Sequence, residues 1–144
     1  MTITSAITDS FKAELLEGLH NCAGDAFKLA LIVANPTGTY DQTITSYSQL
    51  GTDEIPAGMG YTQGGQTLTN SGVGQSGSQS YTSWGNALWS SSTMSPGGAL
   101  LYNSSKSNRA ICVLAFPARI STVNGSLSVV MPSLAPNTAL IEVN

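Results

Sequence analysis

The chain has 144 residues, of which 41% are hydrophobic and only 9% are charged, and its net charge is -3 at pH 7. An average soluble domain carries roughly 25% charged residues, so neutral polar groups must cover this surface. Binding to nucleic acid or to an anionic membrane depends mainly on clustered Lys and Arg. The basic side chains here are scattered, namely Lys12, Lys28, Lys106, Arg109 and Arg119. We therefore expect neither nucleic acid nor a membrane among the partners.

Residues 1–144 are enough for one domain with a hydrophobic core and too few for two comfortable ones. No apolar run, Leu29 to Ala34 included, approaches the roughly 20 residues that cross a bilayer. Met1 to Ser10 lacks the basic start and apolar stretch of a secretory signal, so we expect folding in a cytoplasm. Cys22 and Cys112 lie in unlike contexts and are expected to be free buried thiols rather than a disulfide.

The first predicted element is an amphipathic helix over about residues 9–21. Apolar side chains recur there at helical spacing, and polar ones take the other face. The apolar set is Phe11, Leu15, Leu16 and Leu19, and the polar set is Lys12, Glu14 and Glu17. Thr8, Asp9 and Ser10 offer N-cap oxygens, and Asn21 with Gly24 supplies the stop. Phe11, Leu15 and Leu19 should pack against a sheet, because so short a helix is marginal alone.

A buried strand is predicted directly after this helix. From Phe27 to Val33 the pattern has period two, and after Lys28 both faces are apolar. A strand of this kind lies in the centre of a sheet and is covered on both sides. We expect one face to be covered by a second sheet and the other by the helix.

The middle third, residues 39–95, is rich in Gly, Ser and Thr and contains only short strand candidates. These are Gln42 to Tyr47, Tyr61 to Thr69 and Ser80 to Trp89. The polar stretches between them, Thr52 to Gly60 and Asn70 to Ser78, are predicted as long loops. A flexible linker is the alternative for Ser71 to Ser78. We expect this region to contribute little to the core, which its flanks would supply.

The last third is the most regular part of the sequence. The predicted strands are Ala99 to Tyr102, Ala110 to Phe116, Ser126 to Met131 and Ala139 to Val143. Ser104 to Asn108 and the dipeptide Asn124-Gly125 have the composition of hairpin turns. Short strands from about residue 26 to residue 143, separated by turns, predict a mainly β, antiparallel β-sandwich or jelly-roll-like domain with one N-terminal helix.

Side chains that could carry out catalysis are sparse. His20, the single histidine, lies near the predicted helix end, where an exposed or capping role is the common outcome. Asp53 and Glu54 form the only adjacent carboxylate pair, and we interpret them as part of a solvated loop. Gly58 to Gly65 has neither the lysine nor the strand-to-helix context of a phosphate loop. We expect no enzymatic activity, catalytic residue, metal site or cofactor.

Trp84 and Trp89 are the residues with a possible partner contact. They are an odd number of positions apart, so one straight strand cannot direct both indoles toward the core. Either the chain bends at Gly85-Asn86 and both are buried, or one indole is exposed to anchor a partner or a glycan.

Several segments, in order along most of the chain, resemble small structural proteins of tailed-bacteriophage virions. They are Ser10 to Asn21, Asp25 to Leu31, Gly60 to Gly65, Gly98 to Asn103 and Ser107 to Ala110. The sequence departs from these proteins at Ser71 to Ser78 and at Pro117-Ala118-Arg119. The resemblance implies a non-enzymatic virion protein, assembled in the host cytoplasm.

The role favoured within this class is a capsid decoration or cement protein. Such a protein stabilises the head shell, usually as a homotrimer bound to the major capsid protein. We expect the loops between Thr39 and Ser95 to make most of the contacts. The alternatives are a tail or fibre module that contacts the host surface, and a carbohydrate-binding module. The sequence has no heptads or internal repeats typical of a fibre.

Overall fold

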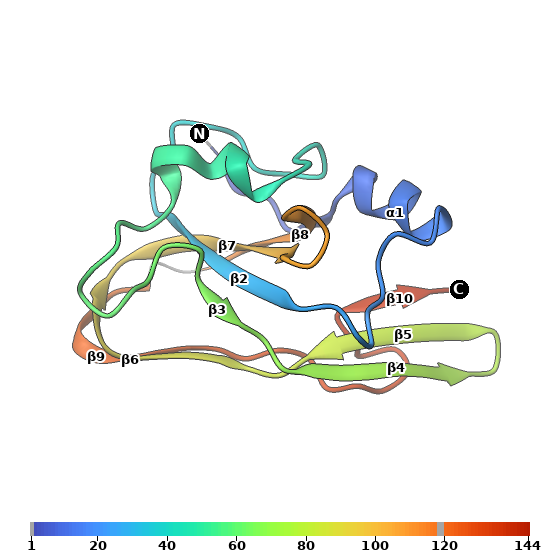
Figure 1. Cartoon of the computed structure of the whole chain (residues 1–144). Helices are drawn as coiled ribbons and strands as arrows, with labels where there is room; N and C mark the ends of the chain where they lie inside the picture. Colours follow the sequence, from blue (N-terminus) through green and yellow to red (C-terminus); the bar gives the residue numbers. More distant parts are fainter. Residues whose placement is uncertain (1, 118–119) are drawn as a thin grey trace.

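The computed structural model describes residues 2–117 and 120–144 and has two stacked β layers (Figure 1). The first layer is a five-stranded sheet in the order β1 (Ala6–Ile7), β8 (Arg109–Ala115), β7 (Pro96–Asn103), β2 (Phe27–Val33) and β3 (Gln66–Thr67). The second layer contains β10 (Ile141–Val143), β5 (Gln79–Trp84) and β4 (Asn70–Ser76), with the pair β6 (Ala87–Met94) and β9 (Thr122–Val129). Neighbouring strands pair antiparallel. The expected mainly β, sandwich-like fold with one N-terminal helix is confirmed.

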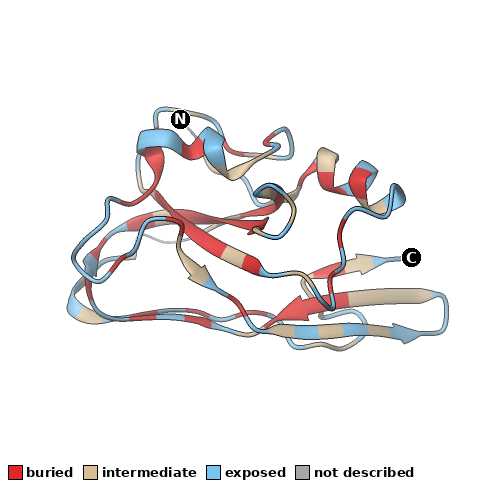
Figure 2. Cartoon of the chain, viewed as in Figure 1, coloured by how far each residue is buried: buried red, intermediate tan, exposed pale blue. Residues whose placement is uncertain are grey.

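β2 is buried on both faces, as its sequence predicts (Figure 2). Phe27, Leu29 and Leu31 belong to one core cluster, which also includes side chains of β5, β6 and β9. Ala30 and Ile32 belong to a second cluster, which is completed by residues from the segment 40–50. This segment leads into the short 3-10 helix η1 (Tyr47–Asp53). The prediction that the N-terminal helix covers the second face is therefore wrong.

The helix α1 spans Asp9–Leu16 and ends well before the predicted residue 21. Its N-cap is Thr8, whose hydroxyl oxygen accepts a hydrogen bond from the Phe11 amide at 3.2 Å. Gly18 has a φ of +74°, and the Leu19 amide bonds back to the Glu14 carbonyl at 2.9 Å, so the chain closes a left-handed C-terminal cap.

This early end changes which side chains of the helix are buried. Phe11 is buried in the core and Leu15 packs partly against it. Leu16 is 92% exposed and Leu19, predicted to pack on the sheet, is 37% exposed. Glu14, assigned to the solvent face from the sequence, is buried instead.

The middle third differs most from the sequence-based expectation. Residues 42–47 form no strand, and only Gln66–Thr67 of the predicted strand 61–69 is extended in a sheet. Residues 70–76, predicted as a loop or a linker, form β4 in a hairpin with β5. This third also supplies the buried side chains Leu50, Tyr61 and Trp84, so it is a full part of the core.

The last third follows the prediction closely, because β7, β8, β9 and β10 overlap the four expected strands. Residues 104–108 form the expected turn. Asn124-Gly125 is not a turn, however. It lies inside β9, where Asn124 has a φ of 49° and the pairing with β6 changes register, so its conformational freedom serves a bulge. Of the Pro117-Ala118-Arg119 departure, residues 118 and 119 lie outside the described part.

Cys22 and Cys112 are buried free thiols, as expected. Within residues 2–117 and 120–144, no helix is long and apolar enough to span a membrane.

Candidate interaction surface

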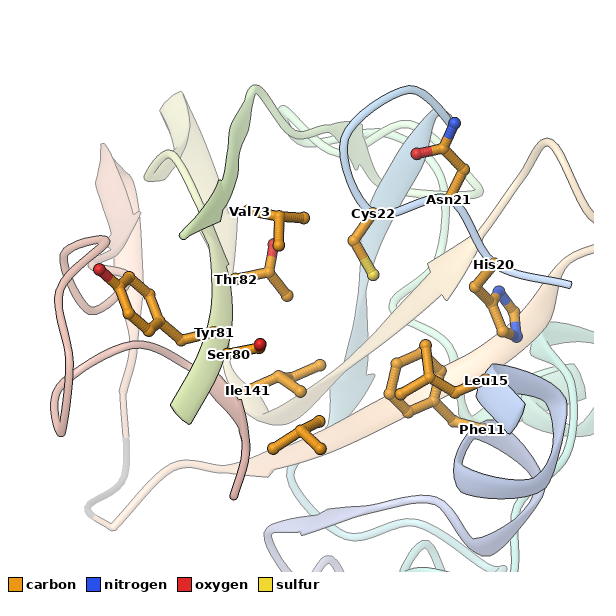
Figure 3. Close-up of a pocket in the computed structure, with 11 residues that line it drawn as sticks. Phe11, Leu15, His20, Asn21, Cys22, Val73, Ser80, Tyr81, Thr82 and Ile141 are labelled. Carbon is orange, nitrogen blue, oxygen red and sulfur yellow. The ribbon is translucent and has the colours of Figure 1, made fainter. Parts of the chain in front are cut away.

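An open groove of about 380 Å³ lies between α1 with its following turn and the sheet of β4, β5 and β10 (Figure 3). We call it the α1–hairpin groove. Its lining comes from both ends and the middle of the chain and is mostly apolar. The lining residues are Phe11, Leu15, His20, Asn21, Cys22, Val73, Ser80, Tyr81, Thr82, Ile141 and Val143.

The strand side of the groove follows from the pairing register. Thr82 is opposite Val73 on one side and opposite Ile141 on the other. Residues directly opposite in antiparallel strands point to the same face of the sheet. The three therefore form one row across β4, β5 and β10. Tyr81 alternates to the other face, and Figure 3 shows its ring directed away from this row.

The groove has a buried floor and an exposed apolar rim. Phe11, Thr82 and Ile141 are at most 5% exposed. At the rim, Val73 is 58% exposed and Val143 is 51% exposed. An apolar concavity with exposed apolar edges is typical of a site that a partner covers.

A chain of polar side chains supports the helix side of the groove. Glu14 accepts a hydrogen bond from Arg109 Nε at 2.6 Å, and its other oxygen lies 2.9 Å from His20 Nε2. Burial opposes ionisation of Glu14, but the hydrogen bonds from His20 and Arg109 outweigh it and lower the pKa of this carboxyl. The helix is thereby tied to the start of β8.

The same chain continues through the opposite side of the imidazole. Asn103, at the end of β7, places its Nδ2 2.9 Å from His20 Nδ1 and 2.8 Å from Asp25 Oδ2. Asp25 also accepts from the Asn21 amide and from Lys106 Nζ, at 3.0 and 3.3 Å. Burial opposes the ionisation of Asp25, but these donors outweigh it and lower its pKa.

His20 is therefore not the exposed or capping residue that the sequence suggested. It is 7% exposed and packs against the Phe11 ring at 5.1 Å between centroids. The left-handed Gly18 turns the chain back beneath the helix and carries His20 inward. If the helix continued to residue 21, the His20 ring would lie elsewhere. The wrong helix end therefore led to the wrong prediction that His20 is exposed or capping.

Asp53 and Glu54 are also buried rather than solvated, at 5% exposure each. Asp53 accepts from the Thr37 and Gly38 amides, both at 2.9 Å, and from the Tyr40 hydroxyl at 2.6 Å. Glu54 accepts from the Tyr61 hydroxyl and the Gly64 amide, both at 2.7 Å. The two carboxylates fix η1 and its neighbouring loops, and neither lines the α1–hairpin groove.

Trp84 and Trp89, left open as partner contacts, both lie in the core at 1% and 2% exposure. The Trp84 ring meets Phe27 edge-on at 5.1 Å, and the Trp89 ring lies 6.2 Å from that of Tyr61. The chain leaves β5 at Trp84 and enters β6 at Ala87, so the alternative with a bend at Gly85-Asn86 is correct. Neither indole offers an exposed face to a partner.

Sequence reasoning missed the residues that form the strand side of the groove. Val73 is set between Gly72 and Gly74 in a segment that resembles a loop, and Ile141 is separated from it by most of the second half of the chain. The only usable signal was the weak period-two pattern of the final strand, which places Ile141 and Val143 on one face.

Comparisons of the chain with protein-family models, with curated proteins and with solved structures returned no match. In the part of the chain that the structure describes, no three His, Cys, Asp or Glu side chains gather in a way that could hold a metal ion.

Proposed function

We propose that this chain is a non-enzymatic structural protein of a tailed-phage virion, bound to the outside of the head as a decoration or cement protein. This role is supported by the segments that resemble such proteins and occur in the same order along the chain. The α1–hairpin groove carries the proposal, because it is a partly exposed, mostly apolar surface whose lining contains no Asp, Glu, Lys or Arg. In this proposal the major capsid protein covers the groove, and three copies assemble around a threefold position of the shell.

The chemistry of the rim suits attachment to another protein. Val73, Ser80 and Val143 carry no charge, so covering them strands no unpaired ion in a buried interface. The β4–β5 hairpin extends beyond the rest of the molecule, where a neighbouring subunit can contact it (Figure 1). This hairpin lies within residues 39–95, the region expected to make most contacts. The sequence favoured this region because it resembled loops outside the core. In the structure the region is folded, and the exposed hairpin is what supports a contact.

The test is rebinding of purified protein to phage heads that lack it, measured by co-sedimentation. The variant Val73→Asp introduces a carboxylate at the groove rim. Since an uncompensated charge in a covered interface costs more than the 1.4 kcal/mol of a tenfold change, we expect affinity to fall by at least about tenfold. Val123→Asp is the matched control, because Val123 is an exposed strand valine outside the groove, at 82% exposure.

The rival roles give different results in the same experiment. A tail or fibre module would bind tails or host envelopes and not heads. A carbohydrate-binding module would be retained on polysaccharide, although both tryptophans that could form a stacking platform are buried. Equal head binding by Val73→Asp and Val123→Asp would reject the groove as the contact.

A further inference from the structure

The hydrogen bonds around Asn103 determine the proton position on His20. The Ser105 amide donates to Asn103 Oδ1 at 3.0 Å, which fixes the orientation of the side-chain amide. Asn103 Nδ2 must then be the group that faces both Asp25 Oδ2 and His20 Nδ1. An amide nitrogen only donates, so His20 Nδ1 must accept. With Nδ1 as the acceptor, Nε2 is the ring nitrogen that donates to Glu14.

Protonation of the ring removes this acceptor. His20 Nδ1 would carry a hydrogen directed at the hydrogens of Asn103 Nδ2, across a distance of 2.9 Å. Rotating the Asn103 amide does not restore the network. Its Oδ1 would then face the Asp25 carboxylate, and its Nδ2 would face the Ser105 amide hydrogen. Either orientation loses at least one hydrogen bond of this network.

The neighbouring charges do not offset that loss on the Asn103 side. Glu14 attracts a charged imidazole, but it already accepts from the ring in the neutral state and is paired with Arg109. On the other side, Asp25 is paired with Lys106. The nearby Cys22 thiol carries no charge, since burial, together with the charge of Asp25, raises its pKa.

We propose that His20 is a pH-sensitive latch for one wall of the α1–hairpin groove. In its neutral form, the ring joins α1 to Asn103 and, through Asn103, to the connection 21–25. In its charged form, it releases Asn103 and loosens that connection. His20, Asn21 and Cys22 line the groove, so acidification alters the shape of the wall that a partner would contact. This inference concerns the folded chain and does not depend on the identity of the partner.

The composition of the chain allows the His20 ring to be observed without signals from other histidines. His20 is the only histidine. Glu14 and Asp25 have lowered pKa values and stay ionised between pH 8 and pH 5.5. A change in this network over that range is therefore not caused by either carboxylate.

The direct test is NMR of the intact protein with nitrogen-15 in the imidazole and backbone, titrated from pH 8 to pH 5.5. We expect the proton on Nε2 at pH 8. We also expect the Asn21, Asp25 and Ser105 amide signals to shift with the same midpoint as the ring. A proton on Nδ1 at pH 8 overturns the proposal. So does a ring that titrates without moving these amides, or one that stays neutral throughout.

A second measurement uses His20→Gln, whose amide can donate and accept but cannot titrate. The wild-type melting temperature should fall by about 3 °C between pH 8 and pH 5.5, as one lost buried hydrogen bond produces in a chain of this size. The melting temperature of the variant should fall by less than half as much over the same pH range. Parallel curves for the two proteins overturn the proposal, and if the variant does not fold, the wild-type NMR result decides.

Discussion

Asp53 is a buried carboxylate that forms no ion pair with any Lys, Arg or His of the described residues 2–117 and 120–144, and hydrogen bonds hold it ionised. Burial would raise its pKa, but the donors Tyr40, Thr37 and Gly38 together outweigh burial and lower the pKa to about 2. Because the folded-state pKa is below the unfolded value of 3.8, Asp53 stabilises the fold above about pH 4. That contribution is lost as the pH falls from about 4 to about 2.

The variant Asp53→Asn should lose about 1.5–3 kcal/mol of unfolding free energy at pH 7, the usual loss for hydrogen bonds to a charged group. The deficit relative to wild type should shrink toward pH 2, where about half of Asp53 is protonated even in the folded protein. Urea unfolding at both pH values measures this. Glu17→Gln, at an exposed carboxylate, serves as the control and should change little. A deficit that is the same at pH 7 and pH 2 would contradict the account.

Gly65 is required by close backbone approach as well as by its φ of +81°. A Cβ at this position would lie 1.8 Å from the Leu29 carbonyl oxygen on the central strand. Gly77, in the β4–β5 turn, also has positive φ, but a Cβ there meets nothing within 4 Å. Gly77→Ala should cost only the left-handed strain of about 1–2 kcal/mol.

Gly65→Ala adds a backbone clash to the same strain, so we expect a loss of about 2–5 kcal/mol. Thermal unfolding of the two alanine variants side by side separates clash from strain. Equal losses would mean that the β2–β3 contact is looser than the structure has it.

At the scale of elements, the apolar packing of α1 comes mainly from Phe11 rather than from an apolar stripe, and the hydrogen bonds of Glu14 add to it. Phe11 is 1% exposed, whereas Leu16 of the same helix is 92% exposed. Phe11→Ala should cost about 3–5 kcal/mol, as is typical for a buried aromatic, and Leu16→Ala should stay within about 0.5 kcal/mol. Denaturant midpoints of both variants check this. A large loss in Leu16→Ala alone would point to a helix packed on another face.

The strands whose apolar pattern is visible within the strand itself were predicted well. β2, β7 and β8 contain the apolar stretches Leu29 to Val33, Ala99 to Tyr102 and Ala110 to Ala115, and their positions follow from those stretches. β4 was missed because Gly72 and Gly74 leave alternate positions without side chains, which removes the period-two signal. The predicted helix end at residue 21 is wrong because Gly18 forms the left-handed cap, which the spacing of apolar and polar side chains does not indicate.

At the scale of the whole molecule, the groove and its polar support depend on pairings that local patterns do not specify. Arg109 contacts Glu14 across a separation of 95 positions in the sequence, and Asn103 contacts His20 across 83. Val73 and Ile141 share one face of the sheet because both are paired with the same residue of β5, Thr82. The composition of the chain predicts a neutral surface. The strand topology decides which of the neutral residues are exposed side by side.

Under the proposed function a tailed phage encodes this chain, and cryo-electron microscopy of its intact particles tests the proposed role most directly. The account predicts density for the chain at regular threefold positions on the outside of the head. The α1–hairpin groove should face the major capsid protein. Density confined to the tail, or its absence from the particle, would contradict the account.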